Sequence, residues 1–169
     1  MTSRTTSTTT QLLSGSQSTH VTATEYLQAI EFFEATLKTH PDRYAWTGRG
    51  FALLQLGRYE EAIASYDQAL TLRSADETSW CNRGHALYRL GRYPEALASY
   101  NQALSLEPDF DAAFYGKARV YAVSGKLQLA IDNLCRAIAL SPEEYSHIAA
   151  NDPCLRHLWQ TNTLPSEAS

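Results

Sequence analysis

A block of 34 residues occurs twice in succession in this chain, and this repeat constrains the fold more than any other feature. Residues 43–76 and 77–110 are identical at 18 of 34 aligned positions. A third, more divergent copy occupies residues 111–144, and residues 24–42 match only the second half of a copy. Self-similarity at a fixed period of this length is typical of chains that stack one supersecondary unit several times.

Each copy has the pattern of two helices. Apolar residues recur three and four apart in two runs, which are separated by a glycine at Gly57, Gly91 and Gly125. A glycine at this point suits the left-handed cap that ends a first helix and reverses the chain. The sequence therefore predicts an all-α fold with helices over residues 24–39, 43–56, 59–72, 77–90, 93–106, 111–124, 127–140 and 142–150.

The ends of the chain differ from the repeats. The first 24 residues contain 14 Ser or Thr and no acidic residue, so ordering them costs more entropy than their burial returns. At the other end, Ser141 and Pro142 favour a capping helix, followed by a short last helix with Leu155, Leu158 and Trp159. We expect a disordered tail (1–22), a repeat domain (23–160; half repeat 24–42, full repeats 43–76, 77–110 and 111–144, cap 142–159) and a flexible tail (161–169).

Composition limits the class of protein. The 169 residues carry 18 acidic and 14 basic side chains, and the net charge of −4 argues against nucleic acid as a partner. Three cysteines without a CxxC pair favour a reducing compartment, and no apolar run is long enough to span a membrane. We therefore expect a cytoplasmic protein without membrane insertion. The Ser/Thr-rich N-terminus leaves an organelle transit peptide, and thus an organelle stroma, as the alternative.

Three short motifs recur at the 34-residue spacing and give the chain a family resemblance. They are Trp–x3–Gly–x2–Leu, Gly–x–Tyr–x2–Ala and Tyr–x2–Ala, beginning at Trp46, Gly57 and Tyr66 in the first full copy. With these motifs the chain resembles tetratricopeptide repeat (TPR) proteins, and the second copy is similar to those of bacterial, especially cyanobacterial, members. The resemblance implies a right-handed superhelix of stacked helix–turn–helix repeats. In this family the first helices line a concave groove that binds peptide segments of partner proteins.

The groove that the resemblance implies has a mixed aromatic, amide and cationic lining. The three predicted first helices carry six cations and two anions, and both anions lie in first turns, where the helix dipole accounts for them. This surplus favours a peptide with carboxylates, or a free C-terminus, as the ligand. The candidate ligand-binding residues are Tyr44, Thr47, Phe51, Asn82, His85, Arg89, Tyr115 and Arg119.

Structural roles compete with ligand binding at several of these positions. The cations at Arg49, Arg83 and Lys117 recur in every repeat, which indicates packed stems whose charged heads pair with a neighbour. Arg89 and Arg119 do not recur and are the better ligand candidates. Tyr115 and Phe51 are equally compatible with packing between neighbouring first helices.

Some members of the family bind the acidic C-termini of cytosolic chaperones through a clamp of lysine, asparagine and arginine side chains. Of the five clamp positions only Asn82 matches here; the others hold Thr47, Phe51, Ala112 and Gly116. The resemblance therefore argues against a chaperone terminus as the partner.

No catalytic motif or phosphate-binding loop is present, and no cofactor is implied. One weak metal-ligand cluster occurs in the cap (His147, Asp152, Cys154 and His157), and Cys81 is either a redox-sensitive thiol or a packing residue. We therefore predict a non-enzymatic adaptor or scaffold, monomeric, that binds a short acidic segment of a partner protein. The alternatives are a self-assembling structural module, an assembly or chaperone-like factor for a larger complex, and a small metal- or redox-active protein.

Overall fold

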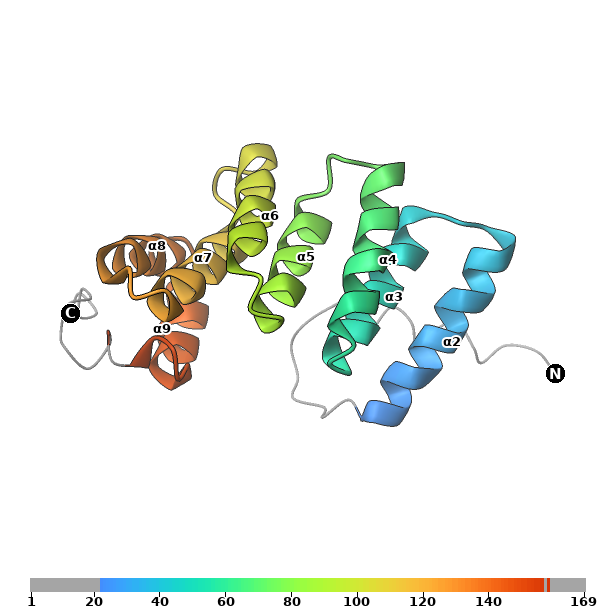
Figure 1. The fold of residues 1–169 in the computed structure, drawn as a ribbon, viewed down its shortest axis with the longest axis horizontal. Coiled ribbons are helices and arrows are strands. Elements are labelled where there is room, and N and C mark those ends of the chain that lie inside the picture. Colours follow the sequence, from blue (N-terminus) through green and yellow to red (C-terminus); the bar gives the residue numbers. More distant parts are fainter. Residues whose placement is uncertain (1–21, 157, 159–169) are drawn as a thin grey trace.

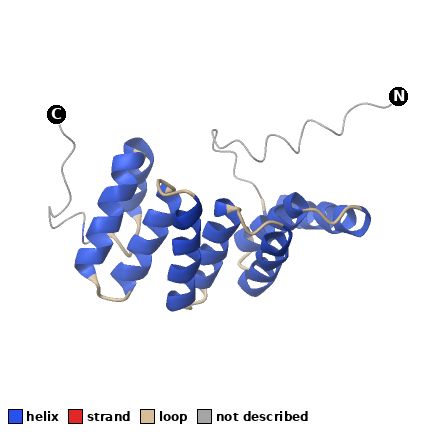
Figure 2. Ribbon diagram, turned by 90° about the horizontal axis from the view of Figure 1, so that it is seen from above, coloured by secondary structure: helices blue, strands red, loops and turns tan. Residues whose placement is uncertain are grey.

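Helices account for all the regular structure in residues 22–156 and 158, the part of the chain that the computed structural model describes (Figure 2). Successive helices lie side by side from α2 at one end to α8 and α9 at the other (Figure 1). Their bounds agree with the predicted ranges to within one residue: α2 (Ala23–Thr39), α3 (Arg43–Gln55), α4 (Tyr59–Leu72), α5 (Glu77–Arg89), α6 (Tyr93–Leu106), α7 (Asp111–Val123), α8 (Leu127–Leu140) and α9 (Pro142–Asn151).

The predicted all-α fold of stacked helical pairs is confirmed. Helices α3 and α4, α5 and α6, and α7 and α8 form three antiparallel pairs, flanked by α2 and α9. The predicted tails (1–22 and 161–169) lie outside the described residues, as does Trp159, with the exception of Thr22. Thr22 belongs to the fold and not to a tail, because its side chain caps α2.

Glycine ends the first helix of each pair, as predicted. Gly57, Gly91 and Gly125 have φ angles of 75°, 74° and 72°, in the left-handed region where a side chain is disfavoured. After α3, Arg58 N–H donates to the Leu53 carbonyl at 2.9 Å and Gly57 N–H to that of Leu54 at 3.1 Å. These two hydrogen bonds satisfy carbonyl groups that have no partner within the helix, and the chain reverses its direction here.

The helix starts are less uniform than the sequence suggests. Asp42 and Asp76 cap α3 and α5 by accepting from the backbone N–H three residues later, whereas Phe110 stands at this position before α7. Ser141 occupies the N-cap position of α9, as predicted, but its side chain makes no capping hydrogen bond. Its hydroxyl donates to the carboxylate of Asp111, at the start of α7.

The core follows the small–large alternation of the repeats. Alanines of the second helices, such as Ala62, Ala96 and Ala130, are fully buried and allow neighbouring helices to approach. The ring of Tyr100 fills the space beside two first helices, against Gly84 of its own repeat and Gly116 of the next. An aromatic side chain of a second helix therefore seals the contact between two repeats.

Arg49 connects three helices. Its guanidinium donates to the Ser65 hydroxyl of α4 at 2.7 Å and to the Glu34 carboxylate of α2 at 3.0 and 3.1 Å. One repeat later the same contacts are made by Arg83, to Ser99 at 2.8 Å and Asp67 at 2.7 Å. We call this arrangement the inter-repeat staple. The prediction that these two arginines are structural is confirmed.

The third copy has different residues at all three positions of the staple. Lys117 replaces the arginine, Asn101 the carboxylate and Asn133 the serine. Among the described residues Lys117 makes no ion pair, and burial lowers the pKa of its ammonium group. The interface between α6 and α7 therefore lacks the electrostatic link of the two earlier interfaces.

Restoring the staple is expected to stabilise the fold. The triple substitution Asn101→Asp, Lys117→Arg and Asn133→Ser supplies a half-exposed ion pair and a hydrogen bond, together worth about 1 kcal/mol. Chemical denaturation of this variant, compared with Lys117→Arg alone, measures the gain. Without the carboxylate the single substitution gains nothing, so an equal gain in both proteins contradicts the assignment.

Candidate functional site

The eight candidate residues lie on the first helices of the three pairs. Helices α3 and α5, and α5 and α7, contact each other, so the first helices form neighbouring rows. Within each helix the candidates are three, four or seven residues apart and therefore share one side. We call this surface the inner face, formed by Tyr44, Thr47 and Phe51 on α3, Asn82, His85 and Arg89 on α5, and Tyr115 and Arg119 on α7.

Two aromatic side chains are exposed at the α3 end of the inner face. Tyr44 is 68% exposed, and the guanidinium carbon of Arg43 lies 3.9 Å from its ring centroid. Phe51 is 42% exposed and packs edge-to-face on Tyr26 of α2, with ring centroids 6.4 Å apart. Phe51 therefore contacts a neighbouring helix and still offers apolar surface to a ligand.

Thr47 belongs to a polar network that joins the first two repeats. The buried carboxylate of Asp76 accepts from Ser79 N–H at 3.2 Å and from its hydroxyl at 3.0 Å, and Arg43 lies 3.2 Å away. The hydroxyls of Ser79 and Thr47 are 3.0 Å apart. The hydroxyl of Thr47 thus has a partner within the fold.

The middle of the inner face carries two polar side chains, Asn82 and His85. The side chains of Asn82 and His85 are partly buried, and neither makes a hydrogen bond to another described residue. Burial, together with the charges of Arg119 and Arg89, lowers the pKa of His85 to about 4, so its imidazole is neutral near pH 7. Arg89 is exposed, with its guanidinium carbon 4.8 Å from the ring centroid of Tyr59. Both amide and imidazole can donate and accept hydrogen bonds here.

At the α7 end the candidates contact the C-terminal cap. The Tyr115 hydroxyl donates to the Asp152 carboxylate at 2.7 Å, and Arg119 Nε lies 2.8 Å from the same oxygen. Burial and this hydrogen bond raise the pKa of Tyr115. Its ring also packs on Tyr145 of α9, with centroids 5.1 Å apart. The carboxylate of Asp152 therefore contacts two of the eight residues predicted to bind a ligand, Tyr115 and Arg119.

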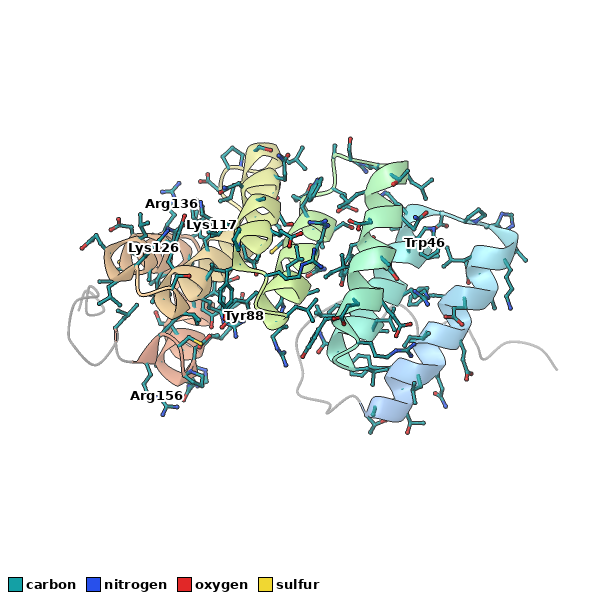
Figure 3. All side chains as sticks on the ribbon, viewed as in Figure 1. Trp46, Tyr88, Lys117, Lys126, Arg136 and Arg156 are labelled. Carbon is teal, nitrogen blue, oxygen red and sulfur yellow. The ribbon has the colours of Figure 1, made fainter. Side chains whose placement is uncertain are left out.

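Sequence reasoning missed two residues of this site. Tyr88 lies three residues after His85 on α5, and its ring centroid is 4.3 Å from the Arg119 guanidinium carbon. Figure 3 shows it at the end of α5 that is nearer to α9. Helical spacing from His85 could have identified it. Asp152 carried no such signal, because it lies outside the repeats.

The cationic surplus of the first helices is smaller than their sequence suggests. Four of the six cations pair with carboxylates of other elements: Arg43 with Asp76, Arg49 with Glu34, Arg83 with Asp67, and Arg119 with Asp152. Of the other two, Arg89 lies on the inner face and Lys117 does not. The basic character predicted for the inner face therefore depends on Arg89 and, once its partner is displaced, Arg119.

The structure gives little support to a redox-active thiol or a metal site. Cys81 is buried, and burial raises the pKa of its thiol to about 12, which disfavours the reactive thiolate. Within the described residues no group of three or more His, Cys, Asp or Glu is placed to hold a metal ion, while His157 lies outside them. None of the described helices is long and apolar enough to cross a bilayer.

This fold is that of a helical-repeat protein. Antiparallel helix pairs recur along the chain, and their first helices lie in neighbouring rows. Sequence comparison specifies the family. Residues 50–91 match the model described as TPR repeat, and residues 78–110 match that described as tetratricopeptide repeat. The chain is a tetratricopeptide repeat protein. No curated protein matches its sequence.

Solved structures show the same fold. MamA is 18% identical, with a TM-score of 0.69 over 83% of this chain and 81% of MamA. YrrB, described as a TPR protein with an unusual peptide-binding site, is 24% identical, with a TM-score of 0.65 over 73% of this chain and 65% of YrrB. The second TPR domain of RPAP3, bound to the HSP90 peptide SRMEEVD, is 25% identical, with a TM-score of 0.57 over 64% of this chain and 99% of that domain.

Proposed function

We propose that this protein is a non-enzymatic adaptor that binds a short extended segment of a partner protein on its inner face. TPR folds generally mediate protein–protein and peptide binding, and two of the similar structures are described with a peptide or a peptide-binding site. The observation that carries the proposal is the pair Asn82 and His85, whose side chains have no hydrogen-bond partner in the part of the chain that the structure describes. An extended peptide presents N–H and C=O groups that such a pair can satisfy.

The surrounding side chains define the ligand further. Tyr44 and Phe51 offer exposed aromatic surface next to the polar pair, and aromatic residues are common energetic anchors of interfaces. Arg89, exposed at the other end of α5, favours a carboxylate on the ligand. Three first helices about 10 Å apart span roughly 20–25 Å, the length of about six to eight extended residues.

The chaperone peptide of the RPAP3 structure is not the ligand that we propose. Gly116 stands where the chaperone clamp needs a long cationic side chain, and a Cβ added there would lie 2.4 Å from the Tyr100 ring. A side chain at 116 therefore requires Tyr100 to move. The acidic preference proposed here rests on Arg89 and Arg119 instead.

Selection of peptides from a random displayed library against the full chain tests the proposal. We expect selected peptides to lose about tenfold or more in affinity for Tyr44→Ala, Asn82→Ala or Arg89→Ala, the range of an interface hot spot. Arg136→Ala, which removes an exposed cation on α8, is the matched control. Peptides that bind all three inner-face variants like the wild type, or that depend on Arg136, contradict the proposal.

Self-assembly is the second candidate, favoured by one observation. Leu27 and Phe32 of α2 are 48% and 53% exposed, on a helix whose repeat lacks a first helix among the described residues. Light scattering over a range of concentrations separates the candidates. A mass that rises with concentration in the wild type, and not in Phe32→Ser, favours assembly through α2.

A further inference from the structure

The chain beyond α9 folds back over the first helices of the two preceding repeats. Helix α9 ends at Asn151, and the next residue, Asp152, contacts α7 through its carboxylate. Two residues further on, the sulfur of Cys154 lies 3.2 Å from the Tyr88 hydroxyl of α5. Residues 152–154 therefore lie against the α7 end of the inner face.

The carboxylate of Asp152 accepts hydrogen bonds from Tyr115 and Cys154 but none from Arg119. One oxygen accepts from the Tyr115 hydroxyl at 2.7 Å and lies 2.8 Å from Arg119 Nε, and the other accepts from Cys154 N–H at 2.8 Å. The Nε–H group of Arg119 is not directed at the carboxylate as a hydrogen bond requires. No hydrogen bond from the Arg119 guanidinium reaches another described residue.

The Arg119 guanidinium therefore has N–H donors from which Asp152 does not accept a hydrogen bond. A guanidinium binds a carboxylate best through two parallel hydrogen bonds, and Asp152, fixed at the end of α9, does not supply them. The rings of Tyr88 and Tyr115, with centroids 4.3 and 5.9 Å from the Arg119 guanidinium carbon, hold it in place without neutralising its charge.

We propose that Arg119, Tyr115 and Tyr88 form a carboxylate-binding subsite, which Asp152 fills in cis and which a carboxylate of the partner peptide takes over. The inference rests on the proposed function and specifies its acidic preference. A peptide that lies along Asn82 and His85 and continues toward α7 brings its acidic end to Arg119. Its carboxylate, unlike that of Asp152, can approach in the bidentate orientation.

Displacement of Asp152 does not require the cap to unfold. Leu155 and Leu158 are buried in an apolar cluster with Ala118 and Leu134, and they anchor the chain beyond Asp152. The carboxylate of Asp152 contacts the inner face only through Tyr115 and Arg119, and an incoming carboxylate can take over both contacts. The backbone of Asp152 is hydrogen-bonded to Ile148 and Arg156, so the exchange requires its side chain to rotate away and not the chain to leave α9.

Chemical rescue tests the subsite with acetate as the probe. In Asp152→Ala, about 0.1 M sodium acetate at neutral pH is expected to raise the thermal midpoint by roughly 3 °C relative to the same concentration of chloride, as a ligand of about 10 mM affinity does. The wild type, whose subsite is occupied, is expected to show no difference between the two salts. The double variant Asp152→Ala with Arg119→Gln is expected to lose the rescue. Equal responses in all three proteins overturn the proposal.

Nuclear magnetic resonance gives a second readout that does not depend on a cooperative melting transition. The Arg119 Nε–H signal, assigned by its loss in Arg119→Gln, is expected to shift and saturate with acetate in Asp152→Ala and to stay in place in the wild type. Asp152→Asn keeps one acceptor oxygen, which can still accept from Cys154 N–H, while its amide NH2 group can donate to the Tyr115 hydroxyl. This variant therefore preserves the cap if the alanine variant does not fold. A smaller saturating shift in that variant supports the subsite, and a signal that does not respond in either variant overturns it.

The peptides selected on the full chain separate this proposal from the proposed function. If they depend on Tyr44 and Asn82 but acetate rescues neither variant, the adaptor function stands and the subsite is overturned. If acetate rescues Asp152→Ala but no peptide binds, the subsite stands and the adaptor function fails. If both hold, peptides that carry a carboxylate are expected to bind Asp152→Asn about tenfold more tightly than the wild type, since their charged competitor is gone.

Discussion

Replacing Gly116 with valine is expected to lower the free energy of unfolding by about 3 kcal/mol, the upper part of the range for overpacking a core. A Cβ at this position lies 2.4 Å from Cζ and 2.5 Å from Cε1 of the Tyr100 ring. Tyr100 is only 2% exposed and its ring also lies against Gly84, so it has little free space into which it can move. The valine methyl groups add to this conflict and separate α7 from α6.

Helix propensity acts in the opposite direction and makes the sign of the result informative. Valine is a better helix former than glycine by roughly 0.5 kcal/mol, so without the contact to Tyr100 the substitution would stabilise α7. Equilibrium denaturation measures the net effect. A double-mutant cycle with Tyr100→Leu, which shortens the ring, is expected to give a coupling energy of at least about 1 kcal/mol.

Gly91→Ala is the control for a glycine that is needed for its backbone alone. Gly91 has a φ of 74°, and a Cβ there would have no atom within 4 Å, so its substitution costs about 1 kcal/mol through conformation only. That cost is expected to be independent of Tyr100. A Gly116→Val cost that is no larger, or that persists unchanged with Tyr100→Leu, contradicts the packing argument.

Gly116 also illustrates what the sequence reveals and what it does not. Helix ends, turn glycines and the Arg49 and Arg83 staples were predictable, because each recurs at the 34-residue period and the recurrence itself indicates a structural role. The contact between Gly116 and Tyr100 joins two different repeats, and the period does not show which side chain fills which gap.

The sequence predicted where the candidate residues lie, but it did not show which of them already have partners within the chain. Helical spacing placed all eight residues on first helices, as the structure has them. The hydroxyl of Thr47 has a partner in the neighbouring repeat, Ser79. The Tyr115 hydroxyl and the Arg119 guanidinium have a partner in the unrepeated cap, Asp152. Periodicity identifies which residues share a face of a helix. It does not predict contacts with residues outside the repeats, because those residues do not recur.

The Asp76→Ala variant is expected to lose about 3 kcal/mol, because one buried carboxylate serves three groups. Asp76 caps α5 through Ser79 N–H, accepts from the Ser79 hydroxyl, and pairs with Arg43 of the preceding repeat. Loss of the cap costs about 1 kcal/mol and loss of a hydrogen-bonded, partly buried charge about 2 kcal/mol. Alanine leaves the Arg43 guanidinium, whose side chain is 22% exposed, without its carboxylate.

The equivalent cap one repeat earlier separates the two contributions. Asp42 accepts from Ala45 N–H at 2.8 Å and is exposed, so Asp42→Ala is expected to cost about 1 kcal/mol, the value of a cap alone. The difference between the two variants then measures the link between repeats, and a double-mutant cycle of Asp76→Ala with Arg43→Met is expected to recover at least about 1 kcal/mol of it as coupling. Equal losses for Asp42→Ala and Asp76→Ala would mean that Arg43 contributes nothing across the interface. Because stability in a repeat array is a sum of repeat and interface terms, loss of this contact is also expected to let α2–α4 exchange amide hydrogens faster than α5–α8.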